Sequence, residues 1–514
     1  MFVNNRILIG KTEDKRELFI LPEMANRHGL ITGASGSGKT ITLKVMAESF
    51  ADAGVPVFLA DVKGDLAGTA FAGEINEKIQ KRLDNLGIED FKAQNYPVRF
   101  WDLYGEKGHH LRATIESVGS DVLSIILGLS EAQEGNLAIA FAIAKDEELP
   151  LNTVADLRAV LQFISENRSD YNAKYGQITP QSIGAIQRSL LQLQNQGADK
   201  FFGQPMLEIE DFFQTKDGRG VINILDSVKL FQSSDLYAAF LLWILNELFN
   251  KSPEVGDLDK PKLVFFFDEA HLLFNNMPSY RLKMITQIVK LIRSRGIGLY
   301  FISQAPTDIP GDILAQLGNR VQHALRAYTP ADQKTVRAAA DAFRTNQSFN
   351  TEQAILELGT GEALISFQNE KGAPEIVERA TILPPQSRMG TITTEERNHI
   401  IAASPFVTKY DAVARPGQSN TISAPSKPFD PSQAQAEALA KYSIGTSFKK
   451  DEPKQTTVKQ TASKPATKST AKRGKSTAEK AGERFVTNAA GVAGREASKG
   501  ISKGIGSFFK NLFK

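Results

Sequence analysis

The sequence predicts an α/β protein with a mostly parallel sheet, and three observations lead to this prediction. Short apolar runs alternate with helical runs over most of the chain before residue 415. One of these runs, at 28–32, leads into a glycine-rich loop and then an amphipathic helical run. Another, at 262–267, is apolar throughout and ends in two carboxylates, as expected of a parallel strand covered on both faces.

The composition is that of a globular protein with more than one domain: 514 residues, 41% hydrophobic and 23% charged. No apolar run approaches the ~20 residues that a membrane-spanning helix needs. The chain contains no cysteine, which excludes disulfides, thiolate metal sites and a cysteine nucleophile. Because residues 1–6 also lack an export signal, we expect a cytoplasmic location.

The predicted elements divide the chain into five parts. Apolar runs predict strands at 6–10, 17–22, 28–32, 55–61, 97–102, 220–225, 262–267 and 298–304. Helical patterns fill the stretch between the fifth and sixth of these strands. We therefore expect a small N-terminal β-element (1–27), a core in two parts (28–114 and 216–414), a helical insertion (115–215) and a tail (415–514).

The tail differs in composition from the rest of the chain. Residues 441–514 carry 17 Lys/Arg and 5 Asp/Glu, a charge of +12; because the whole chain is +3, residues 1–440 carry −9. Residues 451–480 contain almost no large apolar side chain, which predicts a disordered basic linker. The apolar and basic segment 501–514 suits docking to a protein partner, and packing back on the body or fraying is the alternative. Contact with an anionic membrane is less favoured, because nearby glycines weaken a helix.

The glycine-rich loop is a complete phosphate-binding motif of the form G-x-x-x-x-G-K-[ST]. Its glycines allow backbone N–H groups to point at a phosphate, and the following helix adds its positive end. The lysine would bridge the β- and γ-phosphates of a nucleotide, and the threonine hydroxyl would hold Mg²⁺. The predicted ATP-binding residues are Gly33, Ala34, Ser35, Gly36, Ser37, Gly38, Lys39 and Thr40.

The two carboxylates after 262–267 complete the predicted site. Ligands of parallel sheets lie at the carboxyl ends of the strands, which places Asp268 where it can hold Mg²⁺ through water. Glu269 can then polarise the attacking water, so the pair favours hydrolysis over simple nucleotide binding. Gln304 ends the next strand and is predicted to lie beside the γ-phosphate.

Several longer segments resemble the HerA/FtsK superfamily of hexameric DNA-pumping ATPases, and most closely the bacterial HerA-like helicase family. The resemblance covers roughly residues 6–400 and is carried by segments 28–33, 59–66, 265–274, 291–296 and 316–326. It implies a RecA-like P-loop NTPase fold, a ring of six with ATP between subunits, and movement on duplex DNA.

Residue by residue, the resemblance supports the roles of Lys39, Thr40, Asp268, Glu269 and Gln304. It makes Arg320 the best match for an arginine that reaches a neighbouring subunit's ATP, with Arg326 and Arg293 as rivals. Asp61 either positions the metal's water or caps its own loop. His271 and His323 lie inside the motif segments, and we expect structural rather than catalytic roles for them.

Two functions remain open from the sequence. The first is an ATP-driven translocase or helicase on DNA. The second is a regulatory or assembly ATPase that acts on a protein partner, or at a membrane, through its tail. The acidic body and the apolar, basic C-terminus favour the second, whereas the motif set and the resemblance favour the first.

Overall fold

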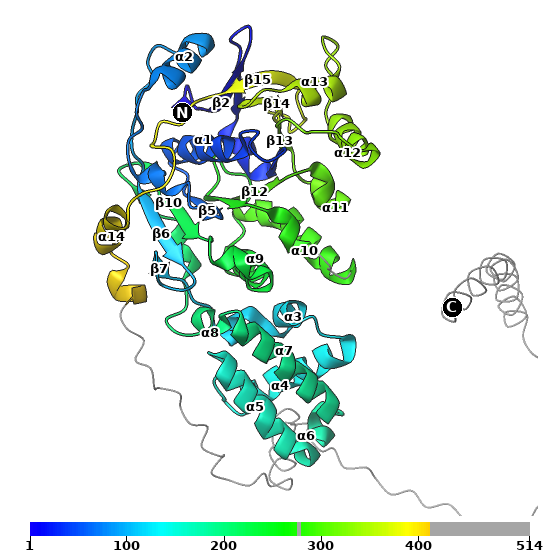
Figure 1. The fold of residues 1–514 in the computed structure, drawn as a ribbon. Coiled ribbons are helices and arrows are strands. Elements are labelled where there is room, and N and C mark those ends of the chain that lie inside the picture. Colours follow the sequence, from blue (N-terminus) through cyan, green and yellow to red (C-terminus); the bar gives the residue numbers. More distant parts are fainter. Residues whose placement is uncertain (275–278, 412–514) are drawn as a thin grey trace, which may run out of the picture. The chain divides into compact units, whose positions relative to one another are not determined.

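The structure is a computed structural model that describes residues 1–274 and 279–411, all within one compact unit. The predicted tail from residue 415 lies outside the described residues. The fold is α/β, as predicted, with a 13-stranded mixed sheet at its centre (Figure 1).

The main sheet has a parallel part and an antiparallel part. The parallel part runs in the order β13 (Asn319–Gln322), β4 (Gly29–Thr32), β12 (Ile297–Ser303), β11 (Leu263–Phe267), β5 (Val57–Asp61), β10 (Ile222–Asp226), β6 (Val98–Asp102) and β7 (His109–His110). The antiparallel part continues from β13 through β14 (Glu362–Ser366), β15 (Glu378–Ile382) and β2 (Arg6–Thr12), which also pairs with β1 (Phe2–Val3) and β3 (Glu17–Ile20). A separate hairpin joins β8 (Thr215–Lys216) to β9 (Arg219–Gly220).

Alternate residues of the central strands enter two different hydrophobic cores. In β11, Val264 and Phe266 pack with helix α1 (Lys39–Asp52). Phe265 and Phe267 pack on the other face with helices α9 (Ser234–Lys251) and α10 (Ser279–Leu291). Because both faces are covered, these strands are apolar at every position, which explains their strong sequence signal.

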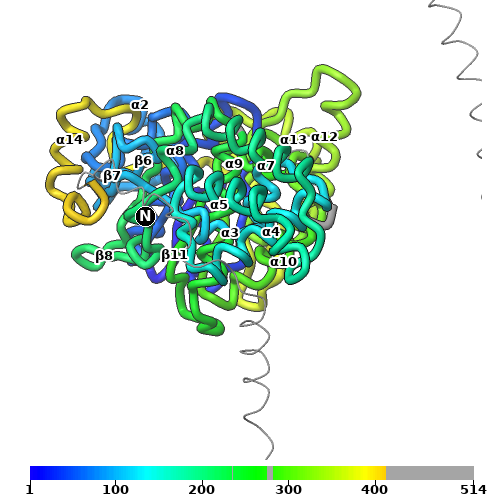
Figure 2. Tube along the Cα trace, turned by 90° about the horizontal axis from the view of Figure 1, so that it is seen from below, coloured from blue at the N-terminus to red at the C-terminus, as the bar shows by residue number. Residues whose placement is uncertain are grey.

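The stretch predicted as a helical insertion contains six helices: α3 (Ile115–Ile126), α4 (Glu131–Asp146), α5 (Val154–Glu166), α6 (Arg168–Tyr175), α7 (Pro180–Asn195) and α8 (Ala198–Phe201). Helix α3 contacts α9, so this module continues the core on that face of the sheet. Figure 2 shows these helices gathered together in the view from below. The remaining α-helices of the described residues are α2 (Glu77–Leu86), α11 (Gly311–Leu314), α12 (Pro330–Asp341), α13 (Thr351–Glu357) and α14 (Thr394–Ala402).

The N-terminal strands do not stand apart from the core. Strand β2 pairs with β15 through residues 10–12, so the boundary predicted at residue 27 does not coincide with a break in the sheet. The pairing was not visible in the sequence because β15 lies more than 360 positions further along the chain. No described helix is long and apolar enough to cross a membrane.

The last described residues pack against β6 and β7. Phe406 and Tyr410 contact the ring of Trp101, with centroids 5.7 and 5.4 Å away. The buried imidazole of His109 lies 2.6 Å from the carboxylate of Asp411. The chain therefore reaches the tail from a fixed point at this edge of the sheet.

Candidate active site

The predicted phosphate-binding loop joins β4 to α1 and is held from both sides. Gly33 N–H donates to the carbonyl of Gln304 at 3.2 Å, and Ala34 N–H donates to the carbonyl of Ala324 at 2.8 Å. These contacts come from the segments after β12 and β13, the two neighbours of β4. Gly38 precedes α1 with φ of 119°, a backbone conformation that favours glycine.

His323 packs against the phosphate-binding loop and links it to α1 and β14. Its Nε2 lies 2.8 Å from the Thr42 hydroxyl, and its Nδ1 lies 2.8 Å from the carbonyl of Glu362. A carbonyl can only accept, so Nδ1 carries a proton. Burial lowers the pKa of His323 to about 4, so the ring is neutral at pH 7 and Nε2 accepts from the Thr42 hydroxyl. A Cβ on Gly33 would lie 2.5 Å from Cβ of His323, which explains why this position requires glycine. These contacts suit the structural role expected for His323.

Lys39 is the first residue of α1 and reaches back over the loop. Its Nζ donates to the carbonyls of Gly33 at 2.5 Å and Ala34 at 3.1 Å. Burial lowers the pKa of Lys39, while the nearby carboxylates of Glu269 and Asp268 raise it. The ammonium therefore lies within electrostatic reach of both the predicted metal ligand, Asp268, and the predicted catalytic carboxylate, Glu269.

Asp268 and Glu269 follow β11, as the sequence predicts. Burial, and then the charge of Glu269, raises the pKa of Asp268 to about 7. Glu269 has φ of 49° and ψ of 46°, a left-handed conformation that non-glycine residues rarely adopt and that is common at functional sites. Its Oε2 is buried without a hydrogen bond and lies 3.4 Å from Nδ1 of His271.

Gln304 and Asp61 occupy the ends of the neighbouring strands. Gln304 is exposed and follows β12, the strand between β4 and β11, so it lies between the loop and the carboxylates in the sheet order. The carboxylate of Asp61 accepts the N–H groups of Gly64, Asp65 and Leu66 at 2.7, 3.1 and 3.0 Å. Of the two roles left open for Asp61, this geometry favours the cap of its own loop.

Arg320 is engaged within its own chain. Its guanidinium donates to the carbonyls of Leu317, Ala342 and Leu314 at 3.0, 2.7 and 3.1 Å. Burial lowers its pKa. Because the guanidinium already donates to three carbonyls of its own subunit, it is poorly placed to reach another subunit. Arg326, by contrast, is exposed and makes one long hydrogen bond, of 3.4 Å, to the carbonyl of Leu356.

The two arginines should therefore respond differently to substitution. Arg320→Ala is expected to lower the free energy of unfolding by about 2–3 kcal/mol, because three backbone carbonyls lose a charged donor. Arg326→Ala should change it by less than about 0.5 kcal/mol. Urea denaturation of both variants checks this, and an unfolding curve of Arg320→Ala that superimposes on the wild type would contradict it.

Two buried neutral histidines predict an acid-sensitive fold. Burial lowers the pKa of His323 and of His28 to about 4. Nε2 of His28 donates to the carbonyl of Val289 at 2.8 Å, and its Nδ1 accepts the Leu299 N–H at 3.0 Å. The unfolded chain protonates histidine near pH 6.5, so each contribution is complete above that pH and is lost as pH falls toward 4.

We expect each of these histidines to cost about 2 kcal/mol of stability between pH 7 and pH 5. His323→Gln should reduce the fall in unfolding free energy over this range by that amount. His399→Gln, on the exposed face of α14, is the matched control and should leave the fall unchanged. The same pH dependence in both variants would argue against this assignment.

The donor groups present suit Mg²⁺ carried with a nucleotide. Thr40 offers a hydroxyl and Asp268 a carboxylate, of which Oδ1 accepts only the Glu269 N–H at 2.9 Å among the described contacts. No cluster of three or more His, Asp or Glu side chains in the described residues could hold a metal alone. This fits Mg²⁺, which is usually held by one or two protein oxygens together with phosphates and water.

The loop, the carboxylate strand and the strand between them define the class of P-loop NTP-binding proteins. The chain matches the family model described as "Helicase HerA-like C-terminal" over residues 6–510. It therefore belongs to the HerA-like helicase family of P-loop ATPases.

The chain is also similar to several named relatives. It is 23% identical over 375 residues to "Probable helicase MJ1565" of Methanocaldococcus jannaschii, covering 71% of this chain and 65% of that protein. It is 23% identical over 351 residues to "DNA double-strand break repair helicase HerA" of Sulfolobus acidocaldarius, covering 66% and 62%. The chain thus spans less than two thirds of the length of either relative.

One solved structure supports a related fold, and a second is reported for comparison. Plasmid coupling protein TrwB in complex with the GTP analogue GDPNP has a TM-score of 0.51 at 13% identity, covering 76% of this chain and 97% of that one. A TrwB complex with ADP and Mg²⁺ has a TM-score of 0.48 at 13% identity, covering 71% and 88%.

Proposed function

We propose that this chain hydrolyses ATP in a ring of six copies and uses the energy to move along duplex DNA. The observation that carries the hydrolysis is the position of Glu269, whereas the ring and the movement on DNA rest on membership of the HerA-like family. It stands in a strained left-handed conformation directly after β11, beside Asp268, and close enough for its charge to act on Lys39. A second carboxylate beside the metal-binding one supplies a base for water, which nucleotide binding alone does not need.

The proposed chemistry assigns one task to each group. Lys39 and the N–H groups of the loop bind the phosphates, and Thr40 and Asp268 hold the Mg²⁺ that neutralises phosphate charge. Glu269 accepts the proton of the water that attacks the γ-phosphorus, and ADP leaves as the β–γ bridge breaks. Gln304 lies at the end of β12 where it can contact the γ-phosphate. Arg326 and Arg293 remain as candidates for the arginine supplied to a neighbouring subunit; Arg293 lies 3.4 Å from the carboxylate of Asp257 and, like Arg326, makes only a long contact.

DNA contact is assigned to α10, which begins shortly after β11. Its exposed positions include Lys283, Gln287 and Lys290, spaced as one face of a helix. The folded body is acidic overall, so such a local basic face is what DNA binding requires. In a ring of six copies, each subunit would contribute these two lysines to the charge that faces the DNA.

The test is steady-state ATP turnover with and without long linear duplex DNA, with Lys39→Ala as the blank. We expect DNA to raise turnover several-fold at low salt and the effect to weaken steeply as salt rises. Lys283→Ala with Lys290→Ala should reduce the stimulation and leave turnover without DNA unchanged. Turnover that ignores DNA at low salt would refute the DNA role while leaving the ATPase intact.

A protein client reached through the tail is the second candidate. The docked segment at Phe406–Asp411 favours it, because a pull on the tail would act on β6 and β7. Removal of residues 441–514 separates the two candidates. Loss of partner recruitment with DNA stimulation intact would assign recruitment to the tail and movement to the body. A cytoplasmic location remains a prediction.

A further inference from the structure

A pocket of about 390 Å³ opens beside the phosphate-binding loop. It begins at Gly36, Lys39 and Thr40 and continues along α1 to Met389. Asp268, Glu269 and Gln304 do not line it. The proposed function requires the γ-phosphate to face those three residues. The nucleoside end of ATP would then extend from the loop into this pocket.

Met389 and Gly390 line the pocket. They belong to residues 386–390, here called the strap, which passes α1 between β15 and α14. Two charged side chains of α1 hold it. Nζ of Lys44 donates to the carbonyl of Arg388, and the carboxylate of Glu48 accepts Gln386 N–H at 2.7 Å. Both side chains are buried, so the contacts are shielded from water.

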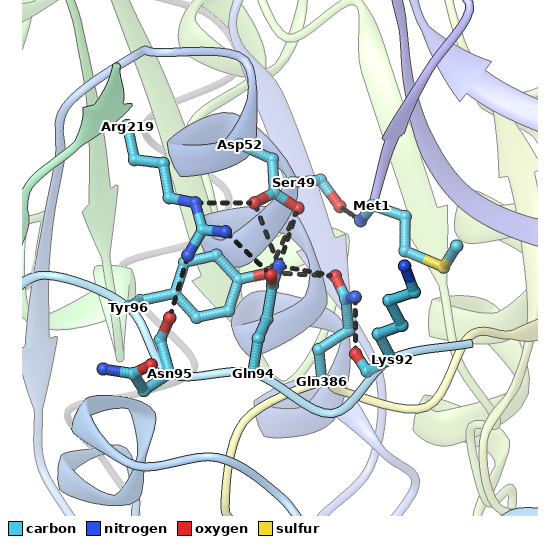
Figure 3. A network of polar contacts seen from close by, with 9 residues as sticks. All are labelled: Met1, Ser49, Asp52, Lys92, Gln94, Asn95, Tyr96, Arg219 and Gln386. Carbon is cyan, nitrogen blue, oxygen red and sulfur yellow. Dashed lines mark hydrogen bonds and ion pairs between the residues drawn. The ribbon is translucent and has the colours of Figure 1, made fainter. Parts of the chain in front are cut away.

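The strap is also fixed on its outer sides. Gly68 N–H donates to the carbonyl of Gly390 at 3.1 Å, and a Cβ on Gly68 would lie 2.3 Å from the carbonyl oxygen of Arg388. Figure 3 shows Gln386 beside Tyr96. The Tyr96 hydroxyl lies 2.9 Å from Oε1 of Gln386 and 3.1 Å from the carboxylate of Asp52, at the end of α1. The backbone on either side of Met389 is therefore held in place.

Met389 itself is 50% exposed, although its neighbours in the strap are buried or half-buried. An unbranched thioether on a fixed backbone is a good surface for the face or edge of an aromatic ring. We infer that Met389 and the strap form the wall against which the adenine base of ATP packs. This inference rests on the proposed use of ATP, and it names the residue that would bind the base.

The test compares two ligands that share the phosphates and differ in the base. Calorimetry measures binding of the non-hydrolysable analogue ADPNP and of inorganic tripolyphosphate, each with Mg²⁺. Met389→Ala should weaken ADPNP binding roughly fivefold or more, because apolar contact with the base is lost, and leave tripolyphosphate binding unchanged. Met389→Leu, which keeps an apolar side chain, should restore most of the ADPNP affinity.

Leu191→Ala is the matched control, because Leu191 is 48% exposed but lies on α7 in the helical module. Equal ADPNP affinity in Met389→Ala and wild type would overturn the inference, and so would an equal loss for both ligands. Failure of the wild-type protein to bind either ligand would instead refute the proposed function. Thermal unfolding should be the same for all these variants, since both residues are exposed.

Discussion

Glu269→Gln is expected to lower ATP turnover roughly 10²–10⁴-fold while nucleotide binding is kept. The amide has nearly the same shape as the carboxylate but cannot accept the proton of the attacking water. The substitution also removes one negative charge close to Lys39 and Asp268, so ADPNP should bind at least as tightly as before. Single-turnover hydrolysis and calorimetry together check both halves of the prediction.

The matched control is His271→Gln. In the wild type, Nδ1 of His271 lies 3.4 Å from Oε2 of Glu269, which is too far for a good hydrogen bond. We therefore expect the His271→Gln substitution to have only a small effect on turnover. Near-normal turnover in Glu269→Gln would show that another group activates the water. The assignment of hydrolysis to this carboxylate would then be wrong.

Lys39→Ala is expected to weaken binding of ADPNP and of tripolyphosphate by roughly 100-fold each, and to abolish turnover. In the structure its ammonium satisfies two loop carbonyls, and a bound phosphate would offer it a charged partner in the same place. Loss of charge-assisted hydrogen bonds of about 1.5–3 kcal/mol accounts for an effect of this size.

Lys63→Ala provides the comparison within the same pocket. Lys63 lines the pocket but is exposed, so its substitution should weaken binding less than tenfold. Equal losses in the two variants would mean that general positive charge, rather than the lysine of the loop, binds the phosphates.

The sequence predicted those parts of the molecule whose signals are local. Strands β4, β5, β11 and β12 are apolar at nearly every position, and the loop is a contiguous motif with a fixed geometry. The α/β fold was predictable for the same reason, because each strand and its following helix carry their own periodicity.

What the sequence did not predict depends on contacts between distant residues. Strands β13, β14 and β15 are short and mixed in polarity, and only their pairing identifies them. Arg320 lies in a motif segment, but nothing in its spacing shows that its guanidinium turns back to Leu314 and Leu317 and also reaches the carbonyl of Ala342, 22 residues further along the chain.

The strap was missed for the same reason. The paired Lys44 and Glu48 of α1 look like an exposed i, i+4 pair, whereas both are buried against residues 386–388. An apolar helix face with two charges on it was the available signal. Buried charges need hydrogen-bond partners, so this pattern indicates that another segment of the chain packs on α1 and supplies them.

The most direct test of the account is displacement of a third strand from a DNA triplex, which reports movement along the duplex. We expect the wild-type protein to displace it with ATP and Mg²⁺, and neither ADPNP nor the Glu269→Gln variant to support displacement. A triplex that stays intact while DNA-stimulated ATP hydrolysis proceeds would contradict the account, because hydrolysis would then serve something other than movement on DNA.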